Sequence, residues 1–299
     1  MSYGLLGKTA LITGGGRGIG LEFAIRLLQG GCNVVIADVA LTEEAKTLVE
    51  KYSKGSPKAV FQKTDATEWA QLQEAFDVAT KTFNGLDIVC PGAGIFDPPI
   101  SNFWYPNETA TQRSSYKTFD LNINHPVRAT QLAIDTFLRL SPEKPHGTVL
   151  LVSSIAAQMA AAPVPLYCAS KAAVSSFTRS LGVLEQINGI RVVCLAPGNV
   201  QTQIWTADGV DRAKWLKEGE DIWTPIEAIV DGMIALLPGA GEGGEYEGGT
   251  VLEVTAAGRR KVEIHNDAGP NGRKGTTVSG AGEYGGAEIV GQLQKEFGK

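Results

Sequence analysis

The sequence predicts an α/β fold in which a doubly wound parallel sheet is covered by helices on both faces. Short runs rich in Val, Ile and Leu alternate along the chain with longer segments of helical period. Most of the short runs are apolar almost without a break, as strands are when both faces of a parallel sheet are covered. Ligands of such sheets bind beyond the carboxyl ends of the strands, so functional side chains are expected there.

The alternation gives seven strands and six helices. The expected strands are residues 8–13, 32–37, 58–62, 86–90, 147–153, 190–196 and 249–255. The expected helices are residues 18–29, 42–53, 67–83, 115–140, 167–187 and 225–237. Right-handed crossovers would join the strands into one seven-stranded parallel sheet. Residues 1–255 are therefore expected to form one domain, and the Gly-rich residues 256–299 a C-terminal extension to which the sequence assigns no role.

Composition and charge are those of an ordinary soluble protein. The chain has 299 residues, of which 43% are hydrophobic and 20% charged, and its net charge is −5. This acidic balance is not that of a nucleic-acid binder, and no apolar run reaches the roughly 20 residues that a membrane helix needs. The four cysteines have neither metal-ligand nor redox spacing, so we expect no metal, buried free thiols and a cytoplasmic location.

A glycine-rich stretch, TGGGRGIG, joins the first expected strand to the first expected helix. Gly14, Gly18 and Gly20 allow a tight turn that brings backbone N–H groups close to a pyrophosphate at the helix N-terminus. Taken alone, such a turn is as often a mere loop as a nucleotide-binding site. Its place between the first strand and the first helix favours a dinucleotide site.

Two charged residues near this loop favour different cofactors. Asp38 ends the second strand, where a carboxylate can accept hydrogen bonds from the adenosine ribose hydroxyls and repels a 2′-phosphate. Arg17 favours the opposite choice, since its cation can meet that phosphate. We give Asp38 the greater weight and expect NAD, with NADP as the alternative. Asp38 could also be a strand-end turn residue, and Asp65, expected near the adenine, could also cap a helix.

A tyrosine and a lysine stand four positions apart in YCASK and share one face of a helix. The pKa of tyrosine is about 10, too high for a general base at neutral pH, but an adjacent ammonium such as that of Lys171 lowers it. Core packing would explain Tyr167 equally well if the pair stood alone. Ser154 changes the balance, because it ends the fifth strand where a hydroxyl reaches the ligand edge, although a cap or turn role also fits it.

Eight motifs follow one another over about residues 5–255: TGGGRGIG, ADV, TDAT, PGAG, DLNINHP, Ser154, YCASK and PGNVQT. In these motifs the chain resembles the short-chain dehydrogenase/reductase family. Two stretches, LYCASKAAVSSFTRS and WTPIEAIVDGMIALL, are similar to its 15-hydroxyprostaglandin dehydrogenase-like branch. The resemblance implies a Rossmann-like NAD(P)-binding catalytic domain. It also implies a homodimer or homotetramer joined through the helices at 115–140 and 167–187.

The resemblance further implies roles for the matching residues. Tyr167 would be the acid/base, and Lys171 would lower its pKa and hold the nicotinamide ribose. Ser154 would orient the substrate oxygen, while Asn122 would fix a helix bend and a water that relays protons. The expected cofactor contacts are Gly14, Arg17, Gly18, Ile19, Gly20, Asp38, Val39, Asp65, Ala66, Gly92, Ala93, Gly94, Tyr167, Lys171, Pro197, Gly198, Val200 and Thr202.

Three positions depart from the family pattern. Pro91 and Gly92 replace two asparagines that usually brace the central strand, so support must come from elsewhere. His125 stands where a glycine is common, and we expect it to be structural. Val164 stands where prostaglandin dehydrogenases carry a polar side chain that contacts substrate, which argues against transferring their specificity.

The sequence therefore predicts an NAD-dependent enzyme that interconverts a secondary alcohol and a ketone. The expected substrate contacts, which indicate a largely apolar small molecule, are Phe96, Trp104, Ser154, Val164 and Trp205. The tryptophans could equally anchor loops or a subunit contact. Two alternatives remain: an NADPH-dependent ketoreductase of a biosynthetic pathway, and a non-enzymatic nucleotide-binding sensor or scaffold. The complete Ser–Tyr–Lys set argues against the second alternative.

Overall fold

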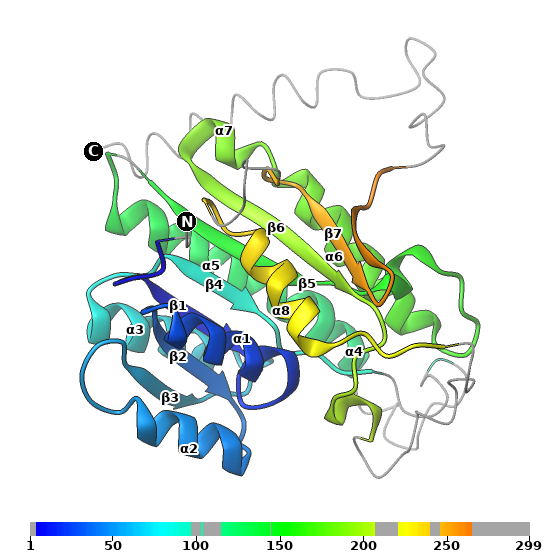
Figure 1. The fold of residues 1–299 in the computed structure, drawn as a ribbon. Coiled ribbons are helices and arrows are strands. Elements are labelled where there is room, and N and C mark those ends of the chain that lie inside the picture. Colours follow the sequence, from blue (N-terminus) through cyan, green and yellow to red (C-terminus); the bar gives the residue numbers. More distant parts are fainter. Residues whose placement is uncertain are drawn as a thin grey trace.

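A computed structural model describes residues 4–96, 103, 115–143, 145–206, 221–239 and 246–264. One sheet runs through the centre of the molecule with helices on both faces (Figure 1). Its strand order is β3-β2-β1-β4-β5-β6-β7-β8. The strands are β1 (Thr9–Thr13), β2 (Asn33–Asp38), β3 (Ala59–Lys63), β4 (Ile88–Pro91), β5 (Gly147–Val152), β6 (Ile190–Pro197), β7 (Val251–Thr255) and β8 (Gly258–Lys261). The α/β fold and all seven expected strands are confirmed, and these seven are parallel.

The expected count of seven strands was wrong, because the sheet has an eighth strand at its edge. β8 pairs antiparallel with β7, from Leu252 opposite Lys261 to Thr255 opposite Gly258. This strand comes from the stretch that was expected to be an extension without a role. Its sequence, GRRK, is exposed throughout and has no apolar alternation, so no hydrophobic pattern marked it as a strand.

The helices match the expected segments with two differences. They are α1 (Gly18–Gln29), α2 (Glu43–Lys51), α3 (Trp69–Phe83), α4 (Lys117–Phe119), α5 (His125–Leu140), α6 (Pro165–Ser180), α7 (Leu184–Asn188) and α8 (Ile226–Ala235). A π-helical turn, η2 (Asp120–Asn124), separates α4 from α5, and the helix expected at 167–187 is divided into α6 and α7. None of the helices within the described ranges is long and apolar enough to cross a bilayer.

Two apolar layers explain why the strands lack polar alternation. Helices α1 and α8 cover one face, where Phe23, Leu27 and Met233 pack against strand residues such as Ile12 and Val34. Helices α3, α5 and α6 cover the other face (Figure 1), where their side chains pack against the intervening strand residues, Leu11, Val35, Val89, Val149 and Leu151. Alternate residues of one strand thus enter opposite layers, and both sets are buried. All four cysteines are buried free thiols, which confirms the expectation for Cys32, Cys90 and Cys194, the three on which it rested.

The chain reverses its direction of travel across the sheet between β1 and β4. β1 pairs with β2 on one side and with β4 on the other, with Thr13 opposite Pro91 at the carboxyl ends. Such a switch point leaves a crevice between the loops that follow the two strands, and ligands of open α/β sheets bind there. Here those loops are the glycine stretch after Thr13 and the PGAG stretch that begins at Pro91.

Candidate active site

A cleft of about 1260 Å³ lies along the carboxyl ends of the strands. It exceeds the range of roughly 300–1,000 Å³ typical of drug-sized ligands, so it has room for a dinucleotide together with a small substrate. Every residue expected to contact the cofactor lines it. Of the expected substrate contacts, Phe96, Ser154, Val164 and Trp205 also line it, while Trp104 lies outside the described residues.

The glycine loop closes one end of the cleft and is packed too tightly for side chains. Gly14 has a φ of 69°, and a Cβ there would lie 2.7 Å from the Cα of Ala93. A Cβ on Gly20 would lie 2.3 Å from the carbonyl oxygen of Gly14. No side chain caps the N-terminus of α1, where Arg17 is the N-cap residue. The first N–H groups of this helix therefore stand at the cleft, as a pyrophosphate site requires.

Asp38 forms the wall of the cleft beside this loop. Its buried carboxylate accepts hydrogen bonds from the backbone N–H of Gly16, at 2.9 Å, and of Ala40, at 3.4 Å. Asp38 thus stabilises the turn after β2 and also places negative charge beside the glycine loop. Its interpretation as a turn residue and its interpretation as a ribose acceptor are therefore compatible. The side chain of Arg17 is exposed at the same end of the cleft.

Asp65 lies at the cleft wall after β3 and is not a helix cap, since the N-cap residue of α3 is Glu68. One carboxylate oxygen accepts hydrogen bonds from the hydroxyl of Thr67, at 2.7 Å, and from its backbone N–H, at 3.0 Å. These bonds lower the pKa of Asp65. The carboxylate is therefore ionised at neutral pH and is held in one orientation.

Tyr167 and Lys171 occupy one face of α6 at the centre of the cleft. The ammonium of Lys171 lies 5.6 Å from the centroid of the Tyr167 ring and donates a hydrogen bond to the carbonyl of Val152, at 3.0 Å. Burial lowers the pKa of Lys171 to about 8, which still leaves most of it protonated at pH 7. A buried positive charge thus stands beside the phenol ring.

The two serines after β5 have different surroundings. Ser153 is buried, donates to the carbonyl of Lys171 at 2.8 Å and shares a hydrogen bond with Ser175, so it ties β5 to α6. Ser154 lines the cleft, and its oxygen accepts a hydrogen bond from the N–H of Ala156, at 3.1 Å, capping the turn η3 (Ile155–Gln158). Because the Ser154 oxygen acts as the acceptor in that bond, its hydroxyl hydrogen can donate to a substrate oxygen.

Asn122 lies in the π-helical turn, so the helix is irregular where a bend was expected. Its buried amide accepts from the N–H of Ile95 and donates to the carbonyl of Ile95, both at 2.9 Å. The same amide donates to the hydroxyl of Ser170, at 3.2 Å. Asn122 therefore clamps the segment after β4 to α6 without itself lining the cleft, and a water relay to Lys171 stays a prediction.

His125 is completely buried and has a structural role. Its Nε2 lies 2.9 Å from the hydroxyl oxygen of Thr13, and its Nδ1 lies 3.1 Å from the carbonyl oxygen of Leu121. A carbonyl only accepts, so Nδ1 carries the hydrogen and Nε2 accepts from Thr13. The Thr13 oxygen in turn accepts a long hydrogen bond, 3.4 Å, from the N–H of Ala93 in PGAG. Sequence reasoning missed Thr13, whose one signal is its place at the end of β1.

Aromatic side chains line the end of the cleft where substrate contacts were expected. The ring of Phe96 meets that of Tyr167 edge to face at 4.6 Å and lies 6.0 Å from Trp205. Trp205 also packs against Trp223, at 5.2 Å, and its indole N–H donates to the carbonyl of Val200. The indole of Trp205 thus both anchors its loop and lines the cleft, and the buried side chain of Val164 adds further apolar surface.

Residues 8–212, which contain the glycine loop and the Ser–Tyr–Lys set, match the family model described as short chain dehydrogenase. The chain belongs to the short-chain dehydrogenase family. The family resemblance found in the sequence is thereby confirmed, and the chain is an oxidoreductase that acts on CH–OH groups with a nicotinamide cofactor. None of these findings tests the prostaglandin dehydrogenase-like branch.

The relatives of this short-chain dehydrogenase are named for different activities. The hydroxynaphthalene reductase-like protein Arp2 of Metarhizium acridum is 33% identical over 235 residues, covering 78% of this chain and 82% of its own. Galactitol 2-dehydrogenase of Agrobacterium fabrum is 34% identical over 216 residues, covering 71% and 79%. A short chain dehydrogenase of Burkholderia cenocepacia, solved in complex with NADP, is 26% identical with a TM-score of 0.68, covering 84% of this chain and 97% of its own.

Proposed function

We propose that this enzyme interconverts a secondary alcohol and a ketone on a largely apolar small molecule, with NAD as its cofactor. The observation that supports the reaction is the buried ammonium of Lys171 beside the ring of Tyr167, in the cleft that Ser154 also lines. A pure nucleotide binder would have no need of a buried cation at this phenol.

Each of the three side chains has a separate task in this proposal. The charge on Lys171 stabilises the phenolate of Tyr167, which takes the proton of the substrate hydroxyl. Ser154 donates its hydroxyl hydrogen to the same substrate oxygen and holds it in place. When bound, NAD supplies the acceptor for the hydride that leaves the carbon. In the reduction, the Tyr167 phenol gives its proton to the carbonyl oxygen.

The cofactor would be held by groups that the fold already places along the cleft. The N-terminus of α1, behind Gly14 and Gly20, fits a pyrophosphate, since side chains in that loop would collide with backbone. Asp38 would accept from the adenosine ribose, and Lys171 would reach the nicotinamide ribose. The place of each residue on the cleft wall supports these roles.

The aromatic wall supports a planar apolar substrate. The ring of Phe96 packs against that of Tyr167, and the ring of Trp205 lies beside that of Phe96, so a flat ring system could lie against them. The relative from Metarhizium acridum is named for a hydroxynaphthalene, which is such a ring system. Val164 supports the same substrate class, because it offers no hydrogen bond.

A substrate screen tests the reaction. The absorbance of NADH or NADPH is followed with a panel of bicyclic aromatic ketones, hydrophobic secondary alcohols and a polyol such as galactitol. We expect NAD-linked turnover of the aromatic or hydrophobic compounds. Turnover with NADPH alone would favour the ketoreductase alternative, which Arg17 and the NADP complex of the Burkholderia cenocepacia relative support. Nucleotide binding without turnover of any compound would favour a sensor or scaffold.

Asp38→Asn is expected to relax the choice of cofactor. The amide can still accept from Gly16 but lacks the charge that repels a 2′-phosphate, so the ratio of the NADPH Kd to the NADH Kd should fall about tenfold. Both constants are measured by quenching of tryptophan fluorescence. Arg17→Ala is the matched variant, and it should weaken NADPH binding alone. An unchanged ratio in Asp38→Asn would contradict the role of the carboxylate.

A further inference from the structure

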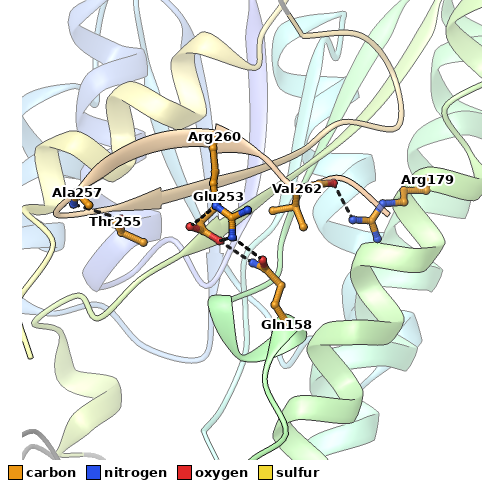
Figure 2. A network of polar contacts seen from close by, with 7 residues as sticks. All are labelled: Gln158, Arg179, Glu253, Thr255, Ala257, Arg260 and Val262. Carbon is orange, nitrogen blue, oxygen red and sulfur yellow. Dashed lines mark hydrogen bonds and ion pairs between the residues drawn. The ribbon is translucent and has the colours of Figure 1, made fainter. Parts of the chain in front are cut away.

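Three polar side chains meet where the β7–β8 hairpin passes the turn after β5 (Figure 2). Arg260 on β8 donates from Nε and Nη2 to the two carboxylate oxygens of Glu253 on β7, at 2.9 and 2.8 Å. The same Nη2 donates to the amide oxygen of Gln158, at 3.0 Å, and Gln158 Nε2 donates to Glu253 at 2.8 Å. The three groups thus close a ring of hydrogen bonds, which we call the hairpin clamp.

Glu253 is the sheltered centre of the hairpin clamp. Its side chain is 14% exposed, against 54% for that of Arg260. Burial raises the pKa of Glu253, but hydrogen bonds from Arg260 and Gln158, together with the Arg260 charge, outweigh it and hold the pKa below its ordinary value. Gln158 therefore donates to an ionised and partly desolvated acceptor, which makes a stronger bond than a neutral pair on the surface.

Gln158 belongs to the segment that forms the substrate side of the cleft. It ends the turn η3, which begins directly after Ser154 and is capped by that serine. Met159, Ala161 and Val164, which follow it, line the cleft, and α6 with Tyr167 begins at Pro165. None of the three clamp residues lines the cleft itself. The clamp contacts the substrate side of the cleft through Gln158, which lies within residues 155–164.

The hairpin that carries Arg260 is held at two further places. Arg179 on α6 donates to the carbonyl of Val262, at 3.1 Å, just after β8 (Figure 2). Arg259 makes a long hydrogen bond, 3.4 Å, to the carbonyl of Asp231 on α8. Neighbouring residues of a strand point to opposite sides, so Arg259 does not enter the clamp and provides a control on the same strand.

We propose that the hairpin clamp positions the substrate wall at residues 155–164 and so sets the enzyme's affinity for its substrate. Gln158, Glu253 and Arg260 are positioning residues, since they act through Met159 and Val164 rather than on the reacting atoms. Strand β8 thereby gains a task in the site through Arg260. The effect on turnover rests on the proposed function, whereas the effect on the wall does not.

Hydrogen exchange of the backbone amides tests the wall directly, without turnover. Arg260→Ala and Gln158→Leu are each expected to speed exchange of residues 156–164 about tenfold. Arg259→Ala removes only a long hydrogen bond outside the clamp, so exchange should stay within about twofold of the wild-type rate. The double variant should exchange no faster than Arg260→Ala, because both changes open the same ring. Arg260→Lys should lie between wild type and Arg260→Ala, since an ammonium cannot make the two-pronged contact with Glu253. Exchange at the wild-type rate in Arg260→Ala would overturn the proposal.

Kinetics supply the second measurement, with the best substrate found in the screen. Arg260→Ala should raise KM about threefold to tenfold, with kcat within about twofold and the Kd for NADH unchanged. Faster exchange of residues 156–164 with an unchanged KM would show that the clamp does not affect substrate binding. Failure of the wild-type enzyme to turn over any compound would count against the proposed function, and the exchange result would still decide whether the clamp holds the wall.

Discussion

Replacing Tyr167 with phenylalanine is expected to lower kcat by about 10³-fold or more while leaving the Kd for NADH within about twofold. The change removes one oxygen, which is the group proposed to exchange a proton with the substrate. The ring stays, so the edge-to-face contact with Phe96 at 4.6 Å can persist and the cleft keeps its shape. Steady-state kinetics and fluorescence titration with NADH measure the two quantities separately.

Tyr116→Phe is the matched control for this experiment. Tyr116 is partly exposed before α4 and packs edge to face with Phe119, at 5.8 Å, so it also loses one hydroxyl from an aromatic contact. We expect its kcat to stay within about twofold of the wild type. Appreciable turnover in Tyr167→Phe would sink the acid/base assignment. A parallel loss of NADH binding would show instead that the hydroxyl acts in holding the cofactor.

The parts of the fold predicted from the sequence are those that a local pattern determines. Seven strands are apolar because both faces of the sheet are covered, and that pattern is visible in the residues themselves. The eighth strand, GRRK, is joined to β7 by backbone hydrogen bonds and by Arg260 rather than by apolar burial, so no periodicity could reveal it. A π-helical turn likewise changes the backbone without changing the helical spacing on either side.

In the candidate site, too, residues within local motifs could be predicted, whereas contacts that depend on the tertiary structure could not. The residues expected to contact the cofactor lie in contiguous motifs, and the fold brings those motifs to one cleft because parallel strands end at one edge. Spacing alone could not separate Asn122 from Asn124, since they differ in tertiary contacts: Asn122 binds Ile95 and Ser170, whereas Asn124 binds Asp120 in its own turn. Gln158 and Arg260 are 102 positions apart and belong to no motif, so their contact depends on the tertiary structure alone.

The PGAG stretch, which lacks two asparagines usual in the family, shows what the sequence alone can and cannot predict. The sequence indicates that support near Pro91 and Gly92 must come from elsewhere, without naming its source. In the structure the buried imidazole of His125 holds the Thr13 hydroxyl, which accepts from the N–H of Ala93. A side chain from the start of α5 thus braces the loop that follows β4. This brace works only while Nε2 of His125 is free to accept, which makes it sensitive to acid.

The stability of the protein is expected to fall between about pH 6.5 and pH 4 because of His125. Burial, together with the charge of Lys171, lowers the pKa of His125 from 6.5 to about 4, and hydrogen bonds with backbone groups of Leu121 and Ala93 only partly oppose this shift. In that range His125 is protonated in the unfolded chain but not in the folded protein. The contribution of His125 to the free energy of unfolding is therefore complete above pH 6.5 and is lost as the pH falls toward 4. The shift corresponds to about 3 kcal/mol of unfolding free energy at most.

Urea unfolding of wild type and His125→Gln at pH 7.5, 6 and 5 isolates this contribution from that of the carboxylates. Glutamine does not titrate, so the advantage of the wild type over the variant should shrink by about 1.4 kcal/mol for each pH unit below 6.5. A constant difference for His125→Gln would contradict the prediction. If that variant does not fold, the NMR titration of the wild-type imidazole decides, since a midpoint near 6.5 would show that the buried brace does not exclude the proton.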